Sequence, residues 1–455
     1  MSDLLSLLTL GANGMTAQNA GVAVATNNIA NANTVGYSRE SVDLEALDGS
    51  PDVGGVVAGA TTRSQDTILA GRIQVSSGTL AMSQTYSDAL GDVQSALADG
   101  GPTIDEQLGT LFSSLSQVAA DPTDSTSRDA VVTSAEQLVS GIQQKAASVA
   151  SARDDADSQI QTEAVSATAL ANQLAAANAA VAKTGDPNAL DARDKIANQL
   201  AALVGGTTQI DGNGQMRYVL DGGAVLVDGT HAASLTTTPD PTTGFSRLVV
   251  SDGASQRDVT AQVSGGSIGG ELKLRDGTLA TTANQLDQLA YDVTTSMNSV
   301  STANAGLDGV TGRPMFTALT QVAGAAQAMA VDPALAANSK LLAVAAPGAG
   351  PGDNTGALAL FALGSQNVAS GGTQTLGDAA VGIVGDVAQA ASSAQADVQQ
   401  DTIVSQNLAG LQDSLAGVDT QEEMTNLSKF ENASNAMIKV VSTVDDMLTN
   451  LIENI

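Results

Sequence analysis

Apolar side chains recur in steps of three and four residues at both ends of the chain. Near the amino terminus this stripe contains Leu4, Leu8, Met15, Val22 and Ile29. Near the carboxy terminus it contains Leu427, Phe430, Met437, Val441, Val444, Leu448 and Leu451. This spacing, kept up over about four heptads, is typical of a coiled-coil seam. The pattern predicts a long helix at each end and pairing of the two helices along these stripes.

The longest interior helix is predicted over residues 125–183. This segment is rich in alanine and nearly free of glycine, and Ile160, Ala167 and Leu174 follow one another at intervals of seven. Alanine is the strongest helix former because it loses no side-chain entropy in a helix. Gly185 and the following Asp-Pro predict the end of this helix. Further helices are expected over 189–204, over 278–300 and over most of 355–455.

Two helix starts have the signature of a capping box, in which side chains at the first and fourth positions satisfy free backbone N–H groups. The first consists of Thr103 and Glu106, and an apolar helical pattern follows it. The second consists of Thr420 and Glu423, immediately before the carboxy-terminal stripe. We therefore expect Thr420 to begin the last helix.

Between the helices, glycine becomes frequent from about Thr207 to Arg275, and short β-branched runs alternate with turn signals. The Asp-Gly turn signals start at Asp211, Asp221, Asp228 and Asp252. Alternation of this kind predicts a small antiparallel β domain.

The predicted fold class is mainly α with a small inserted β domain. Residues 1–35 and 416–455 form a terminal coiled-coil domain for polymerisation. Residues 36–204 and 276–415 form a long-helix domain with irregular or β segments, including a Gly- and Pro-containing stretch over 306–354. Residues 205–275 form the antiparallel β domain, which we expect to lie outermost, farthest from the chain ends.

The terminal stripes are narrow, and a single helix pair of this kind is marginally stable in water. We expect the ends to be loose in a free subunit and firm when packed against copies of the same chain. The alternative is a stable intramolecular pair without partners.

Composition excludes several classes of function. The chain has 48 acidic and 18 basic residues, a formal net charge of −30, which repels nucleic-acid phosphates and anionic membranes. Cysteine is absent, which removes disulfides and thiolate chemistry. The first basic residue is Arg39, so no positively charged signal-peptide region precedes it, and no apolar run approaches the roughly twenty residues of a membrane span.

Candidate chemistry is sparse. His231 is the only histidine, and a single histidine builds neither a usual zinc site nor a catalytic triad. The glycine-rich loop around Gly350 lacks the spacing of a nucleotide-binding loop. Asp211, Asn213 and Gln215 lack the sixth-position glycine and the final glutamate of a calcium loop. We expect no catalytic residue, no metal and no cofactor, and therefore no enzyme.

An asparagine-rich segment follows the first stripe. Residues 27–39 read NNIANANTVGYSR and include Asn28, Asn31, Thr34, Gly36 and Tyr37. Asparagine competes for backbone hydrogen bonds and glycine tolerates positive φ, so the segment predicts a structured helix exit. The tyrosine ring is expected to pack on the adjoining seam.

This segment resembles the motif that follows the amino-terminal helix in the axial proteins of the bacterial flagellum, the rod, hook and hook-associated proteins. The stretch from Glu422 to Leu448 is similar to the terminal helix of the same family. Residues 191–200, 225–229 and 353–354 resemble the hook-associated members that form the first layer between hook and filament. On these segments the chain is identified as a member of the axial family.

The resemblance implies a structural subunit of the flagellar tube, located outside the cell at the hook–filament junction. It implies export by the flagellar type III route without a cleaved signal peptide. The terminal coiled coils would line the inside of the tube, and the middle domains would face outward. The implied partners are sister copies, the hook subunit on one side, the next junction protein on the other, and a cytoplasmic chaperone at the carboxy-terminal helix.

Three alternatives remain. The chain could be another axial subunit, either distal rod or hook protein, which is expected to have a shorter or more β-rich middle. It could be an enzyme displayed on a flagellar scaffold, with activity in residues 205–275. A coiled-coil adhesin or chemosensory rod would usually carry a membrane span or signal peptide.

Overall fold

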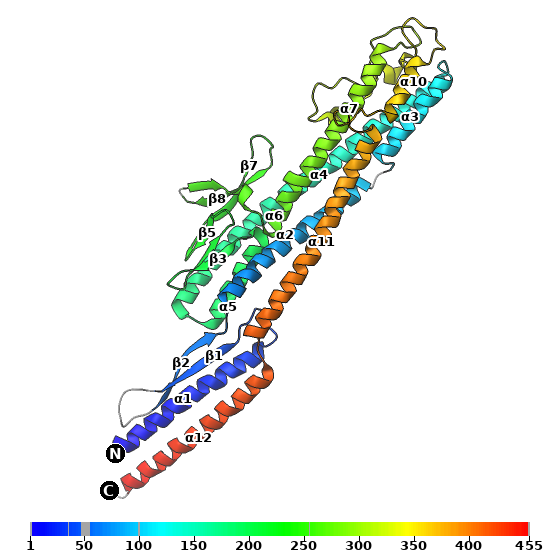
Figure 1. Cartoon of the computed structure of the whole chain (residues 1–455). Helices are drawn as coiled ribbons and strands as arrows, with labels where there is room; N and C mark the ends of the chain where they lie inside the picture. The colour runs from blue at the N-terminus through cyan, green and yellow to red at the C-terminus, as the bar shows by residue number, and fades with distance from the viewer. Residues whose placement is uncertain (1, 35, 47–54, 99–100, 254, 454–455) are drawn as a thin grey trace.

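The computed structural model describes residues 2–34, 36–46, 55–98, 101–253 and 255–453. The molecule is elongated, with both termini at one end and helices along most of its length (Figure 1). Three small antiparallel sheets are present in the described residues. The predicted fold class, mainly helical with a small β insertion and paired terminal helices, is confirmed.

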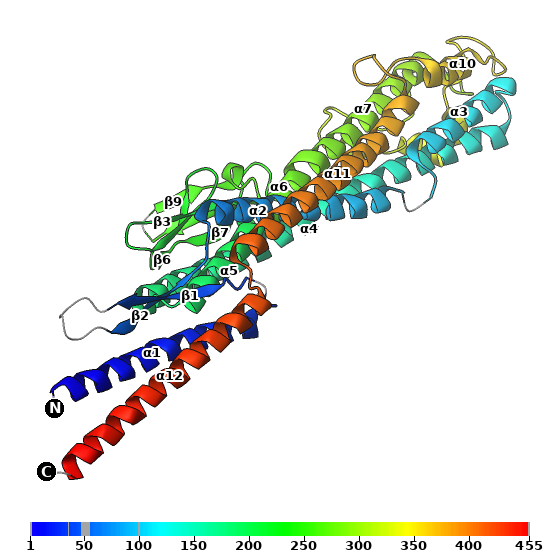
Figure 2. The same ribbon diagram turned by 60° about the horizontal axis from the view of Figure 1, so that its bottom comes forward.

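The two terminal helices are α1 (Ser2–Asn31) and α12 (Thr420–Glu453), and they lie side by side (Figures 1 and 2). The predicted capping box at Thr420 is wrong. Asp419 caps this helix instead, because its carboxylate accepts the backbone N–H groups of Gln421 at 2.9 Å and Glu422 at 3.3 Å. The Glu423 carboxylate is thereby available for contacts with another part of the chain.

A two-stranded hairpin follows α1. It consists of β1 (Glu40–Ala46) and β2 (Val56–Arg63), which pair antiparallel with a register shift between Val42 and Leu44. The hairpin extends beside α1 toward the chain ends (Figure 2). The terminal end of the molecule therefore contains a β element as well as the two helices.

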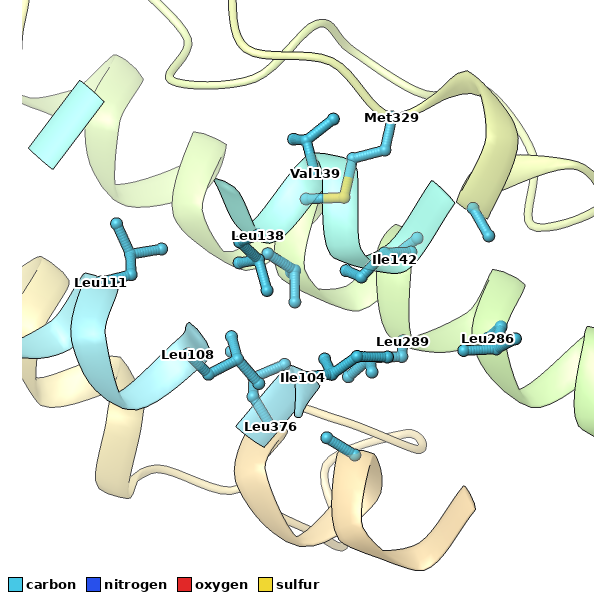
Figure 3. Packing of buried hydrophobic residues seen from close by; sticks show 14 of the residues in the cluster. Ile104, Leu108, Leu111, Leu138, Val139, Ile142, Leu286, Leu289, Met329 and Leu376 are labelled. Atoms are coloured by element: carbon cyan, nitrogen blue, oxygen red, sulfur yellow. The ribbon is translucent and has the colours of Figure 1, made fainter. Parts of the chain in front are cut away.

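The long body is a bundle of helices. Its main members are α2 (Thr67–Ala98), α3 (Ile104–Ala120), α4 (Ser125–Thr184), α7 (Leu279–Ala303) and α11 (Leu376–Ala416). Figure 3 shows leucine and isoleucine side chains from α3, α4 and α7 meeting Leu376 of α11 in one apolar core. The capping box predicted for α3 is present, since the Glu106 carboxylate accepts the backbone N–H of Thr103 at 2.9 Å.

The helix predicted over 125–183 is α4, whose 60 residues are all helical. At 1.5 Å per residue it is about 90 Å long. Asp124 caps its start, and Gly185, at φ 61°, ends it in the left-handed region. The chain then reverses direction, and the helix α5 (Pro187–Val204) packs against the last part of α4.

The β domain packs on the second half of α4. Its strands are β3 (Thr207–Ile210), β4 (Met216–Val219), β5 (Val225–Asp228), β6 (His231–Ala232), β7 (Ser234–Pro239), β8 (Ser246–Asp252) and β9 (Ser255–Asp258). They form two antiparallel sheets, ordered β3-β4-β5-β6 and β7-β8-β9. Tyr218 and Leu226 lie in one core with Ile160, Ala167 and Leu174 of α4. The predicted heptad stripe of α4 is thus the face that carries the β domain.

Short helical segments connect the remaining parts. They are η1 (Thr260–Gln262), α6 (Gly266–Leu272), the π-helical η2 (Lys273–Thr278), α8 (Ala325–Ala328), α9 (Pro333–Ala337), η3 (Ser339–Leu341), α10 (Thr355–Ala362) and η4 (Leu363–Ser365).

The expected position of the β domain needs a correction. It lies along the side of the molecule, and the region around α10 and the adjoining loops is farthest from the chain ends (Figure 1). The reason is the length of α4, which carries the chain from the distal end back toward the terminal helices before the β domain begins.

Candidate assembly site

The contact between α1 and α12 depends on small residues of α1. The buried positions of this helix include Gly11, Gly14, Ala17, Gly21 and Ala25. A Cβ atom at Gly11 would lie 2.7 Å from the Val441 side chain, and one at Gly21 would lie 2.7 Å from the Phe430 ring. Both distances are shorter than a carbon–carbon contact permits. The two helices therefore approach closely because glycine lines one side.

The predicted stripe residues lie around this contact. On α1, Leu4, Leu8, Met15, Val22 and Ile29 are all half-buried. On α12, Val444 is buried, Leu427, Phe430, Met437, Val441 and Leu448 are half-buried, and Leu451 is exposed. The α12 stripe thus fits against small residues of α1, while the larger α1 side chains flank the contact. Their contact with sister molecules stays a prediction.

A second set of apolar side chains on the terminal helices is exposed. It contains Leu5, Leu7, Met424, Ile438, Val440, Met447 and Ile452. Ile452 is 70% exposed and Met424 is 63% exposed, so the helix pair leaves much of its apolar surface in water. An apolar surface of this kind is typical of an interaction site.

A hydrogen-bond cluster, which we call the Asn28 knot, closes the end of the helix pair next to the body. Asn28 is 0% exposed. Its Nδ2 donates to the Glu40 backbone oxygen at 2.9 Å and to Glu423 Oε2 at 3.1 Å. Its Oδ1 accepts from the Glu40 backbone N–H at 2.9 Å and from the Tyr37 hydroxyl at 2.8 Å. One amide therefore links α1, β1 and α12.

The other motif residues build the turn that brings β1 to Asn28. Asn31 Nδ2 donates to the Asn27 backbone oxygen at 3.0 Å, and the Thr34 hydroxyl donates to Asn31 Oδ1 at 3.3 Å. Gly36 has a φ of 85°, which a residue with a side chain rarely adopts. Val35 of the motif lies outside the described residues.

Tyr37 lies among acidic groups. The pKa of its hydroxyl is raised, first by burial and then by the nearby carboxylates of Glu40, Asp191 and Glu423. The phenol therefore stays protonated and can donate its hydrogen bond to Asn28. The packing of the Tyr37 ring on the seam stays a prediction, and the contact that the structure shows is the hydrogen bond from the hydroxyl to Asn28 Oδ1.

Comparisons with known proteins identify the family. A family model described as the helical domain of flagellar hook-associated protein FlgK matches residues 90–316, and one for flagella basal body rod protein matches residues 8–37. Flagellar hook-associated protein 1 of Escherichia coli is 22% identical to the chain, over 98% of the chain and 99% of that protein. The chain belongs to the family of flagellar hook-associated protein 1.

Other members of this family show the same relationship. The Bacillus subtilis hook-associated protein 1 is 24% identical, over 96% of each chain. The Salmonella typhimurium protein is 25% identical over 330 residues, and this match covers 69% of the chain and spans 59% of that relative's length. A solved structure, the flagellar hook junction protein FlgK of Burkholderia pseudomallei, shares the fold with a TM-score of 0.69 at 15% identity, over 76% of this chain and all of that one.

The predicted resemblance to the hook-associated members of the axial family is thereby confirmed. Hook-associated protein 1 is a structural flagellar protein, and the chain is not an enzyme. His231, the only histidine, is exposed on the short strand β6. Within the described ranges, no three His, Cys, Asp or Glu side chains are grouped as a metal site. No helix in that part of the chain has the length and apolarity needed to cross a membrane.

Glu423 is a site residue that the sequence reasoning assigned to another role. It is 3% exposed and lies opposite Asn28, and the Arg39 guanidinium donates to its Oε1 at 2.8 Å. Arg39 also donates to Glu422 at 2.7 Å, and this hydrogen bond is the main cause of the raised pKa of Arg39. The adjacent acidic residues Glu422 and Glu423 indicate that a cationic side chain could bind there. That this cation is Arg39 depends on the tertiary structure.

Proposed function

We propose that the chain is a structural subunit of the bacterial flagellum that joins hook to filament. In this proposal, the subunits form an annular layer outside the cell. The terminal helices α1 and α12 of each subunit pack against those of its sisters around the inside of the tube, and the body faces outward. The observation that carries the proposal is the exposed apolar set on a helix pair that is itself held by a narrow contact.

The neighbours follow from a position in an axial tube. We propose that the hook subunit contacts one side of the layer and the next junction protein the other. Before assembly, an export chaperone would cover the carboxy-terminal helix, where Ile438, Met447 and Ile452 are exposed. Export would use the flagellar type III route. The net charge of −30 supports solubility of the subunit before it meets these partners.

The proposal is tested by deleting the gene and restoring it in variant form. The deletion strain is expected to make hooks and to release filament subunits into the medium. The unaltered gene should restore filaments, whereas Ile438→Asp should not, because it places a charge in the proposed contact between copies. Val165→Asp is the matched control, since Val165 is an exposed apolar residue on α4, away from the terminal helices. Normal filaments in the deletion strain would refute the assignment.

A distal rod or hook subunit is the second candidate, because the rod-protein family model matches residues 8–37. Electron microscopy of the deletion strain separates the two. Loss of a rod or hook subunit would leave cells without hooks, whereas loss of the junction subunit would leave hooks that carry no filament.

A further inference from the structure

The segment from Asp191 to Asp194 on α5 has a role that lies outside the contact between α1 and α12. Arg63, the last residue of β2, donates to Asp191 Oδ1 and to Asp194 Oδ2, each at 2.6 Å. Gln65 donates to the same Asp194 oxygen at 2.9 Å. The second oxygen of Asp191 accepts the backbone N–H of Ser38 at 2.9 Å. We call Arg63, Asp191 and Asp194 the body clamp.

The body clamp and the Asn28 knot are connected by residues 37–40, which face two ways. Hydrogen bonds join three of these residues to the terminal helices. Tyr37 and the Glu40 N–H donate to Asn28 of α1, and Arg39 donates to Glu423 of α12. Ser38, between them, is bonded to the body through Asp191 on α5. Four consecutive residues therefore hold the terminal pair on one side and the body on the other.

Further hydrogen bonds complete the connection between the terminal helix pair and the body, which we call the joint. The Arg39 N–H donates to the Ala416 oxygen at 2.9 Å, where α11 ends. The Ser64 hydroxyl donates to the Leu415 oxygen at 2.9 Å, and the Ser64 N–H donates to the Arg39 oxygen at 2.8 Å. The three chain segments that connect the terminal helices to the body are thus bonded to one another, and none of them behaves as an independent linker.

The burial of the clamp makes its geometry specific. The Arg63 side chain is 6% exposed, that of Asp191 is 12% exposed and that of Asp194 is 22% exposed. A planar guanidinium bonded to two carboxylates has a fixed orientation, which a single ammonium group cannot reproduce. Removing Arg63 would take the paired cation from both carboxylates and leave Asp194 with its longer contact to Arg193, 3.6 Å away, so the arrangement favours one docking geometry.

We propose that the body clamp sets the angle between the terminal helix pair and the body, and that this angle is required for the subunit to enter the tube. The second part of this inference rests on the proposed function, whereas the first part does not. Arg63, Asp191 and Asp194 are positioning residues, because they act on the terminal helices through residues 37–40.

Pulsed electron spin resonance between two spin labels in the free full-length protein measures the distribution of distances between the helix pair and the body. A fixed angle gives a narrow distribution and a variable angle gives a broad one. The chain has no cysteine, so Lys429→Cys on α12 and Val165→Cys on α4 give two defined label sites. Both positions are exposed, and Lys429 is close to the Asn28 knot, where fraying of the helix tips has least effect. The expected wild-type result is one narrow distance peak.

Arg63→Gln, and separately the double change Asp191→Asn with Asp194→Asn, should replace that peak with a broad distribution. Thermal unfolding of the body should stay close to wild type in Arg63→Gln, because Asp194 keeps Arg193 at 3.6 Å and Asp191 keeps the Ser38 N–H. The double variant also removes the charge partner of the buried Arg193, so its body should melt at a lower temperature, and the width of the distance peak is compared below that transition. Arg63→Lys should give an intermediate width, because one ammonium cannot bond both carboxylates in the same plane. Arg313→Gln is the matched control, since it removes the more exposed ion pair with Asp308 on the loop after α7 and should leave the peak narrow.

The same variants are then introduced into the deletion strain. Loss of filaments in the Arg63→Gln strain, with its protein still exported, is the expected result. A narrow peak in Arg63→Gln would overturn the role of the clamp, and a broad peak with normal filaments would overturn the requirement for a fixed angle. If the unaltered gene fails to restore filaments, the proposed function fails, while the distance measurement still decides whether the clamp sets the angle.

Discussion

Replacing Asn28 by alanine removes the side chain on which the joint of the terminal helices depends. Four hydrogen bonds are lost, two donated by Nδ2 and two accepted by Oδ1. The Glu40 backbone N–H and carbonyl are left without these partners in a buried place, while Glu423 keeps its bond to Arg39. The substitution therefore weakens the contact between α1, β1 and α12 without altering the body.

The size of the effect follows from the number and burial of these bonds. A typical hydrogen bond contributes about 0.5–1.5 kcal/mol, and a buried group left unpaired costs about 1–3 kcal/mol. Water can reach the half-buried Tyr37 hydroxyl, and alanine favours the helix by roughly 0.5 kcal/mol over asparagine. We expect the terminal helix pair to lose about 2–4 kcal/mol of local stability.

Hydrogen exchange measures this loss directly. Backbone amides of 22–31 and 420–430 should exchange about 30- to 700-fold faster in Asn28→Ala, since 1.4 kcal/mol corresponds to a factor of ten. Amides in the α3 and α4 core should be unchanged. Asn172→Ala is the control, because Asn172 is exposed on α4 and makes one bond, to the Thr168 oxygen. Equal exchange at 420–430 in Asn28→Ala and wild type would refute the reasoning.

Three further predictions concern packing, pH and proteolysis. Gly21→Ala should lower the local stability of the terminal pair by roughly 1–2 kcal/mol, measured as faster hydrogen exchange, because its Cβ meets the Phe430 ring. Gly71→Ala, with open space around its Cβ, should leave stability unchanged or raise it slightly. Glu271 is buried, and this burial together with Glu163 raises its pKa from 4.5 to about 7. Its contribution to stability is therefore full below pH 4.5 and lost as pH rises through 7, so Glu271→Gln should raise the melting temperature at about pH 8 and change little near pH 4. Limited proteolysis of the free subunit should first trim the outer turns of α1 and α12 and leave the Asn28 knot and the body resistant, and intact tips would contradict this.

The helices were predictable because their signals are local. The alanine content of 125–183 and the glycine at 185 specify α4 and its end without reference to any other segment. The β domain was predictable for a similar reason, since Asp228-Gly229 and Asp252-Gly253 lie at the turns between paired strands. These features depend on backbone conformation and short-range bonds.

The details of the site depend on tertiary contacts and were predicted less well. The apolar pattern identified the α12 stripe, but the opposing surface of α1 is lined by Gly11, Gly14 and Gly21, which carry no hydrophobic signal. Glu423 matches a capping box in sequence, yet its partner Asn28 lies 395 residues away. Sequence periodicity indicates which face of a helix is apolar and cannot indicate how closely a partner approaches it.

The distribution of contacts along the terminal pair explains how it can be both oriented and incomplete. Next to the body, the Asn28 knot provides buried and charge-assisted bonds, which are specific in direction. Toward the free ends, the pair is held by packing against glycine and by the hydrogen bond that the Ser434 hydroxyl donates to Asn19 Oδ1 at 3.0 Å, and Leu5, Met447 and Ile452 remain exposed. Stability should therefore fall from the joint to the tips. A subunit of this kind would present the helix pair at a defined angle and leave its outer turns to be stabilised by neighbouring copies, as the proposed assembly requires.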